Sequence, residues 1–158
     1  MEKKYILTEE TKEVGGHILH KIQAVRDFGD VQKGNLGGWV ESEENLSHDG
    51  DCWIFDNGWV FGNGRVSDDG WVFGNAKIGF NAYISSPRSY FVQGPIGSRN
   101  DFLTCYLDKD KKIYAVTGCF CGSIEVFVKK VKAVHGMNRW AKQYLKAAEM
   151  ARVMLSGD

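Results

Sequence analysis

Aliphatic residues recur at every sixth position through the middle third of the sequence. The positions in this series are Ile54, Val60, Val66, Val72, Ile78 and Ile84. Four residues after each of the first five stands a glycine or an alanine, and that small residue follows an Asn or an Asp. Side chains alternate between the two faces of a strand, and Asn, Asp and Gly tolerate the backbone angles of tight turns. The pattern therefore predicts short strands with inward aliphatic side chains, separated by turns.

An earlier series keeps the same spacing but lies two residues out of phase with the first. Its members are Val40, Leu46 and Cys52, so we expect a two-residue offset near Trp53. An amphipathic helix is the competing interpretation. Glycine or asparagine at nearly every turn would destabilise such a helix, and the spacing favours strands.

The segment from Ile54 to Ser85 resembles the hexapeptide-repeat family, and the match extends more weakly back to Val40. The resemblance implies a left-handed parallel β-helix with three hexads in each triangular coil, so that residues eighteen apart stack. The outward positions beside the aliphatic series are aromatic, and we interpret them as an interface: Trp53, Phe55, Trp59, Phe61, Trp71 and Phe73. The N-terminal segment, the C-terminal domain or a second copy could cover them. We expect internal cover together with self-association into a homo-oligomer.

The fold class that follows is mainly β with a small α/β part, in three segments. Residues 1–38 hold two predicted strands around Gly15 and Gly16 and are expected to cap the open end of the repeat. Residues 39–86 form a short hexapeptide-repeat β-solenoid, which Pro87 ends. Residues 87–158 form a ββαα C-terminal domain.

Within that last segment, two β-rich stretches at 102–107 and 113–120 suit a hairpin with a charged turn. Ser123 is a good N-cap for a first helix that ends at His135 and Gly136. Asn138 can cap a second helix.

Charge and composition place the chain among soluble globular proteins. The formal net charge is zero, but acidic residues predominate over 27–69 and basic residues over 129–158. No stretch is apolar enough for a signal-peptide core or a membrane span. We therefore expect free thiols, a cytoplasmic location, no membrane contact and no sequence-specific nucleic-acid partner.

Catalytic chemistry has little support in the residues. An acyltransferase of the hexapeptide type needs a histidine base, and His48 is the histidine of the repeat region, in its irregular part. A zinc site could be imagined from Cys105, Cys119, Cys121 and His135, but Cys119 and Cys121 alternate along a predicted strand, which favours buried thiols. We expect no catalytic residues, metal or cofactor.

The best candidate for a polar site is the loop from Gly94 to Asp101. Its glycines let backbone N–H groups turn toward a ligand, Ser98 and Asn100 add donors, and Arg99 offers a planar fork that suits phosphate. The competing interpretation is a tight interdomain turn with Arg99 paired to a carboxylate. An aromatic residue, Trp71 or Phe73, could stack on a base.

Four segments resemble a group of small bacteriophage and prophage accessory proteins that join a repeat module to this C-terminal unit. The segments are 26–47, 94–101, 118–123 and 134–138. No activity of the group can be carried over, but the resemblance implies a role inside a bacterial host. We expect a non-catalytic binding protein that blocks an antiviral defence by sequestering an anionic nucleotide-type signal in an oligomer. The alternative is docking of the aromatic face on a host defence protein.

Overall fold

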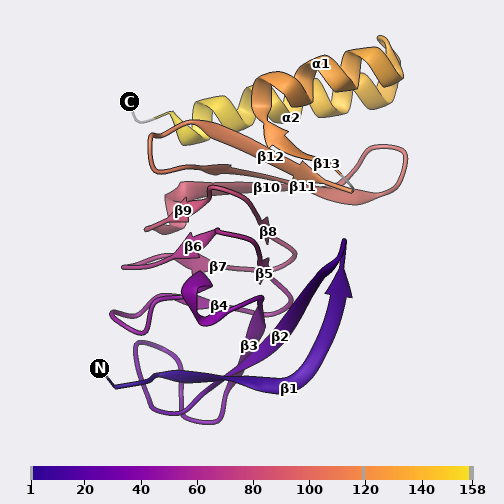
Figure 1. The fold of residues 1–158 in the computed structure, drawn as a ribbon. Coiled ribbons are helices and arrows are strands. Elements are labelled where there is room, and N and C mark those ends of the chain that lie inside the picture. Colours follow the sequence, from indigo (N-terminus) through magenta and orange to yellow (C-terminus); the bar gives the residue numbers. More distant parts are fainter. Residues whose placement is uncertain (1, 119, 157–158) are drawn as a thin grey trace.

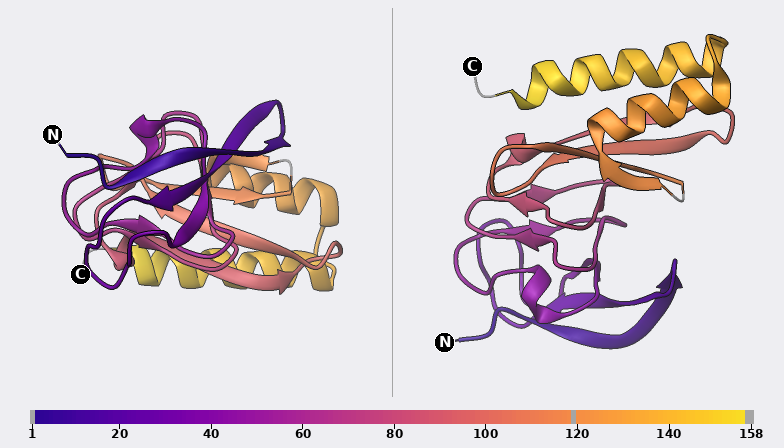
Figure 2. Two further views of the ribbon diagram at one scale, coloured as in Figure 1. Left: turned by 90° about the horizontal axis from the view of Figure 1, so that it is seen from below. Right: turned by 45° about the horizontal axis from the view of Figure 1, so that its top comes forward.

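The computed structural model describes residues 2–118 and 120–156. Figure 1 shows an N-terminal hairpin, a stack of short strands, an antiparallel sheet and a pair of helices, in that order along the molecule. Figure 2 shows that the helices cover the face of the sheet opposite the stack. The chain is thus mainly β with helices at its C-terminal end.

The N-terminal hairpin consists of β1 (Tyr5–Val14) and β2 (His17–Ala24), which pair antiparallel. Gly15 and Gly16 have φ values of 55° and 86°, as the tight turn between the strands requires. β1 continues to Val14, directly before this turn. β2 pairs antiparallel with β3 (Leu36–Val40), which joins the hairpin to the strands of the repeat region.

The repeat region, residues 39–86, consists of very short strands that stack in parallel. They are β4 (Trp53–Ile54), β5 (Trp59–Val60), β6 (Arg65–Val66), β7 (Trp71–Val72), β8 (Lys77–Ile78) and β9 (Tyr83–Ile84). β4 pairs with β7, β5 with β8 and β6 with β9, so residues eighteen apart stack, as the resemblance to hexapeptide-repeat proteins implies. The earlier series pairs twenty apart, with Val40 on Val60 and Leu46 on Val66, and this confirms the two-residue offset.

All six aliphatic residues of the main series have no exposed surface. The small residues between them are required by close packing, since a Cβ atom at Gly64 would lie 2.5 Å from the carbonyl oxygen of Gly79. One 3-10 turn, η1 (Glu43–Asn45), interrupts the earlier series, and a second, η2 (Pro87–Ser89), follows the last repeat strand.

The C-terminal part has more strands than the sequence predicted. Among the described residues, the four strands β10 (Tyr90–Ile96), β11 (Asp101–Leu107), β12 (Ile113–Thr117) and β13 (Phe120–Ser123) form an antiparallel sheet in that order. The predicted hairpin is β11 and β12. The predicted loop begins at Gly94, but β10 continues to Ile96. An edge strand tolerates Pro95 there, beside a register irregularity.

The capping residues predict both ends of helix α1 and the start of helix α2 correctly. Helix α1 (Ile124–His135) has Ser123 as its N-cap and Gly136 as its C-cap, and helix α2 (Arg139–Leu155) has Asn138 as its N-cap. Both cap side chains accept a hydrogen bond from a backbone N–H of the first turn. No helix in the described part of the chain is long and apolar enough to cross a membrane.

The C-terminal sheet is packed on both faces. On one face, Tyr106 and Val116 belong to the core of the repeat region. The Tyr106 hydroxyl also donates to the carbonyl oxygen of Phe80 at 2.9 Å. On the other face, Leu103, Cys105 and other residues of the sheet pack against α1 and α2 in a second core.

Candidate functional site

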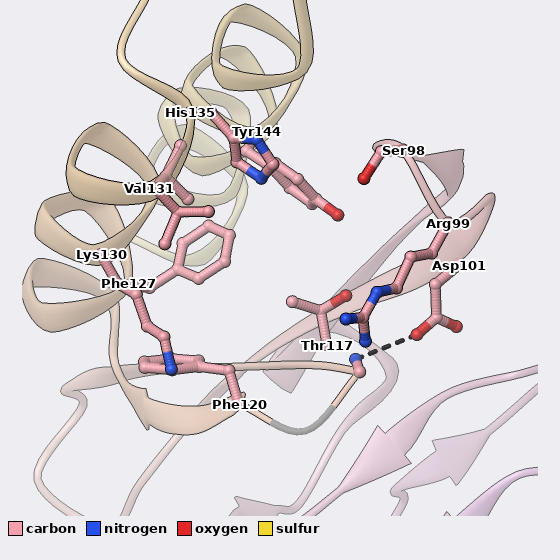
Figure 3. A pocket seen from close by; sticks show the side chains of 12 residues that line it. Ser98, Arg99, Asp101, Thr117, Phe120, Phe127, Lys130, Val131, His135 and Tyr144 are labelled. Atoms are coloured by element: carbon pink, nitrogen blue, oxygen red, sulfur yellow. Dashed lines mark hydrogen bonds between the residues drawn. The ribbon is translucent and has the colours of Figure 1, made fainter.

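An open pocket of about 290 Å³ lies between the turn that joins β10 to β11 and the face of helix α1 (Figure 3). We call it the turn–helix pocket. The residues that line it are Ser98, Arg99, Asp101, Thr117, Gly118, Phe120, Phe127, Lys130, Val131, Val134, His135 and Tyr144.

The turn is held in place by helix α2. Gly97 adopts φ +79°, a conformation that favours glycine, and its N–H donates to Oε1 of Gln143 at 2.8 Å. The N–H of Asn100 donates back to the Gly97 carbonyl at 3.3 Å and closes the turn. As a result Ser98 and Arg99 lie at the mouth of the pocket, opposite α1 (Figure 3).

Aromatic rings form the inner wall of the pocket. The Phe120 and Phe127 ring centroids are 5.5 Å apart, and Tyr144 packs edge-on to Phe127 at 5.7 Å. The His135 ring stacks on Tyr144 at 6.0 Å. Burial raises the pKa of Tyr144, against a hydrogen bond to Thr117, so the phenol keeps its proton at neutral pH.

The carboxylate in the pocket lining is already engaged. Oδ1 of Asp101 lies 3.2 Å from Nζ of Lys77 and accepts from the N–H of Phe102 at 2.8 Å, and Oδ2 accepts from the N–H of Gly118 at 2.9 Å. Burial acts to raise the pKa of Asp101, but these hydrogen bonds and the Lys77 charge lower it below its ordinary value. Asp101 is therefore ionised, and Lys77 offsets its charge.

Cationic groups predominate at the mouth of the pocket. Nζ of Lys130 lies 5.4 Å from the Phe120 ring centroid, and Arg99 extends beside Thr117 on the other side (Figure 3). Within residues 2–118 and 120–156, neither Arg99 nor Lys130 forms a salt bridge. An anion with an apolar or aromatic part could pair with these cationic groups and pack against the aromatic wall.

The structure brings together only part of the predicted ligand site. Ser98 and Arg99 line the pocket, and Asn100 lies in the same turn without lining it. Trp71 and Phe73 are in the repeat region and do not line the pocket. The contribution of α1 was missed; its signal was the three- and four-residue spacing of Phe127, Lys130, Val131 and Val134, which places these residues on one helix face.

Trp53 is covered by the N-terminal segment. Its side chain is 1% exposed and packs edge-on against Tyr5 and Phe28, with ring centroids 6.2 and 5.2 Å away. Trp59 is half-buried beneath Nζ of Lys12 and of Lys77.

Three of the other predicted interface residues form an aromatic cluster on the repeat region. Phe55 stacks on Phe73 with centroids 4.7 Å apart, and Trp71 packs edge-on to both rings. Phe73 remains 44% exposed. Phe61, the sixth of the predicted residues, lies elsewhere and contacts the ring of His17.

Two histidines lie beside carboxylates, His48 in the repeat region and His17 on β2. His48 uses both ring nitrogens, because Nδ1 accepts from the N–H of Lys4 at 3.1 Å and Nε2 lies 2.9 Å from Oε1 of Glu43. Such a ring has no nitrogen left to take a proton from a substrate. Nδ1 of His17 lies 3.0 Å from Glu41, whose Oε1 accepts from the N–H of Gly62.

The cysteines that the structure describes are free thiols. Burial raises the pKa of Cys105 to about 12. Cys119 lies outside the described residues, so the Cys119–Cys121 pair is not compared with a metal site. The described residues include no group of three or more His, Cys, Asp or Glu side chains placed to hold a metal ion.

No protein-family model matches the chain. A segment of 51 residues is 43% identical to the uncharacterized acetyltransferase YdcK of Escherichia coli strain K12. The segment makes up 32% of this chain and 16% of that protein, so the similarity covers a small part of the relative's length.

Proposed function

We propose that this protein is a non-catalytic binding protein that holds a small anionic ligand of the nucleotide type in the turn–helix pocket. The observation that carries the proposal is the placement of Arg99 and Lys130 at the mouth of a pocket with an aromatic wall. Asp101, the carboxylate in the same lining, is held by Lys77.

The balance of charge favours an anion over a cation. A cationic ligand would meet the guanidinium of Arg99 and the ammonium of Lys130 and would find the Asp101 oxygens occupied. A phosphate offers several acceptor oxygens, and arginine donates to two of them in one plane. Ser98 adds a hydroxyl donor at the same side of the mouth.

The wall favours a ligand with a planar apolar part. Phe120, Phe127 and the Tyr144–His135 stack present ring surfaces, and base–aromatic stacking of this kind is worth roughly 1–3 kcal/mol. The pocket volume of about 290 Å³ is at the small end of ligand pockets, which are typically about 300–1,000 Å³. A single nucleotide unit suits it better than a long chain.

The setting that we propose is a bacterial host cell. The stacked parallel strands of the repeat region form a short β-solenoid in this proposal, and the whole chain is a cytoplasmic accessory protein of a bacteriophage. Removal of a nucleotide signal by a stoichiometric binder would block a defence that depends on that signal. Self-association would multiply the sites and cover the exposed part of the aromatic cluster.

Titration calorimetry against a panel of cyclic and linear nucleotides tests the proposal. We expect one nucleotide class to bind, and Arg99→Ala to weaken it about tenfold or more, since a charge-assisted hydrogen bond is lost. Arg88→Ala is the matched control, because Arg88 is exposed on η2 and does not line the pocket. Absence of binding across the panel, or equal binding by Arg99→Ala, would contradict the proposal.

A second candidate is docking on a host protein through the aromatic cluster. The 44% exposure of Phe73 beside Phe55 and Trp71 favours it, because exposed aromatic side chains are typical anchors of interfaces. Pull-down from host lysate should then yield one stoichiometric protein. Trp71→Ala with Phe73→Ala should abolish its capture, whereas Arg99→Ala should not.

A third candidate is acyl transfer, favoured by the partial similarity to the E. coli protein and by the His17–Glu41 pair. A carboxylate at Nδ1 orients an imidazole as a general base. Incubation with acetyl-coenzyme A and candidate acceptors should then release free thiol, and His17→Ala should stop the release. If no acceptor produces thiol above the rate of hydrolysis, this candidate fails.

A further inference from the structure

Three lysines and two tryptophans from different strands converge between the N-terminal hairpin and the repeat region, which lie side by side in Figures 1 and 2. We call Lys12, Lys21, Lys77, Trp39 and Trp59 the lysine–tryptophan cluster. Trp39 pairs with Trp59 and Trp59 with Lys77 on adjacent parallel strands, so these residues form one file along the sheet.

The hairpin places its lysines on this file. Nζ of Lys12 lies 4.4 Å from the Trp39 ring centroid and 4.8 Å from that of Trp59. Nζ of Lys21 lies 5.1 Å from Trp39, and Nζ of Lys77 lies 5.3 Å from Trp59. Two ammonium groups thus lie against each indole ring.

The positive charges of the cluster are not balanced within it. Lys77 pairs with Asp101 at 3.2 Å, and Lys21 donates to the carbonyl oxygen of Gly37 at 2.9 Å. Within the part of the chain that the structure describes, Lys12 forms no salt bridge. Burial and the charges of Lys21 and Lys77 lower the pKa of Lys12.

The indole donors beside these lysines also lack partners. Nε1 of Trp39 and Nε1 of Trp59 are buried and have no hydrogen-bond acceptor among the described residues. Trp71, by contrast, donates its Nε1–H to the carbonyl oxygen of Asp51 at 3.1 Å. Buried donors are normally satisfied, and an unsatisfied one calls for a specific cause such as a bound ion.

We propose that the lysine–tryptophan cluster is an oxyanion site that binds a phosphoryl group through the Lys12 and Lys77 ammonium groups. The cluster offers donors from several elements and has a shortage of acceptors. A phosphate supplies several acceptor oxygens and up to two negative charges, which suits this excess better than a carboxylate does. Lys77 also pairs with Asp101, which lines the turn–helix pocket, but none of the five cluster residues lines that pocket. The proposal does not rest on the function proposed for that pocket.

Titration calorimetry with inorganic phosphate and pyrophosphate tests the site on the full chain. We expect saturable binding of one pyrophosphate per chain, and Lys12→Gln to weaken it about tenfold or more, because a charge-assisted hydrogen bond is lost. Lys132→Gln removes one positive charge from an exposed position of α1 and should leave the affinity unchanged. A loss of equal size in both variants would show unspecific charge attraction and overturn the proposal.

A second readout reports on the tryptophans themselves. In ¹⁵N–¹H spectra, pyrophosphate should shift the indole resonances of Trp39 and Trp59 and leave that of Trp71 in place. Arg99→Ala should not alter this response. If Arg99→Ala abolishes pyrophosphate binding while Lys12→Gln does not, the anion binds in the turn–helix pocket, and the lysine–tryptophan site is refuted. If neither phosphate nor pyrophosphate binds, the lysine–tryptophan site is refuted as well.

Discussion

The α-carbon of Gly97 lies against the hydroxyl of Tyr144, so closely that a Cβ atom at position 97 would overlap the phenol oxygen. Gly97 belongs to the turn that carries Arg99, and Tyr144 belongs to helix α2. The contact sets how closely the turn approaches helix α2. A side chain at position 97 must push the turn and the helix apart.

We expect Gly97→Ala to lower the free energy of unfolding by about 2–3 kcal/mol, through the left-handed backbone conformation and the overlap together. Gly74→Ala is the matched control. Gly74 has φ +62° and no atom within 4 Å of a Cβ position, so Gly74→Ala should lower the free energy of unfolding by only about 1 kcal/mol. Urea unfolding of the two variants measures the difference. Equal losses would mean that Tyr144 moves aside without cost.

The charge on Asp101 should make stability depend on pH. Its folded pKa is lowered below the ordinary value of 3.8, so its contribution is present above that value and is lost as the pH falls through the folded pKa. At pH 7 we expect Asp101→Asn to cost about 1 kcal/mol, since Lys77 loses its partner. Unfolding of both proteins between pH 7 and pH 2 should show this difference shrinking on acidification. A difference that grows instead would contradict the direction of the shift.

The inward position of the repeat valines can be tested by truncation. Val72 has no exposed surface, whereas Val126 on α1 is 53% exposed. We expect Val72→Ala to cost about 2 kcal/mol, because a cavity remains in a packed core. Val126→Ala should change stability by less than about 0.5 kcal/mol. Thermal unfolding of both variants at matched protein concentration measures the two losses of stability. Losses of similar size would mean that Val72 is not in the core.

The N-cap of α1 supports the helix that carries Phe127 and Lys130. The side chain of Ser123 accepts from the N–H of Val126 at 3.2 Å. Ser123→Ala should lower stability by about 1 kcal/mol, while Ser123→Asp, which also caps, should restore most of it. Guanidinium unfolding of the wild type and the two variants tests this order of stability. The prediction fails if Ser123→Asp is no more stable than Ser123→Ala.

Local chemistry determined much of the fold. The six-residue spacing of the aliphatic series was sufficient to predict which side chains point inward, because side-chain direction in a strand depends only on position. The stacking of residues eighteen apart, as in Ile54 on Val72, was implied by the resemblance to hexapeptide-repeat proteins. The caps of both helices were equally readable, since Ser123 and Asn138 act on N–H groups within their own first turns.

Contacts between distant segments could not be read in this way. Trp53 stands at an outward position of its strand, yet Tyr5 and Phe28 cover it. Two strands of the C-terminal sheet were missed, because the partner across the sheet overrides weak local signals such as Pro95.

In the candidate site, too, some residues were predictable from local sequence and others only from the tertiary structure. Ser98 and Arg99 were identified from the sequence because a glycine-rich turn presents its side chains whatever packs beneath it. Only the tertiary structure placed Phe127, Lys130 and Tyr144 across from them. Periodicity and capping are properties of a few consecutive residues. A pocket is a property of how helices pack on a sheet, which depends on the shapes of side chains far apart in the chain.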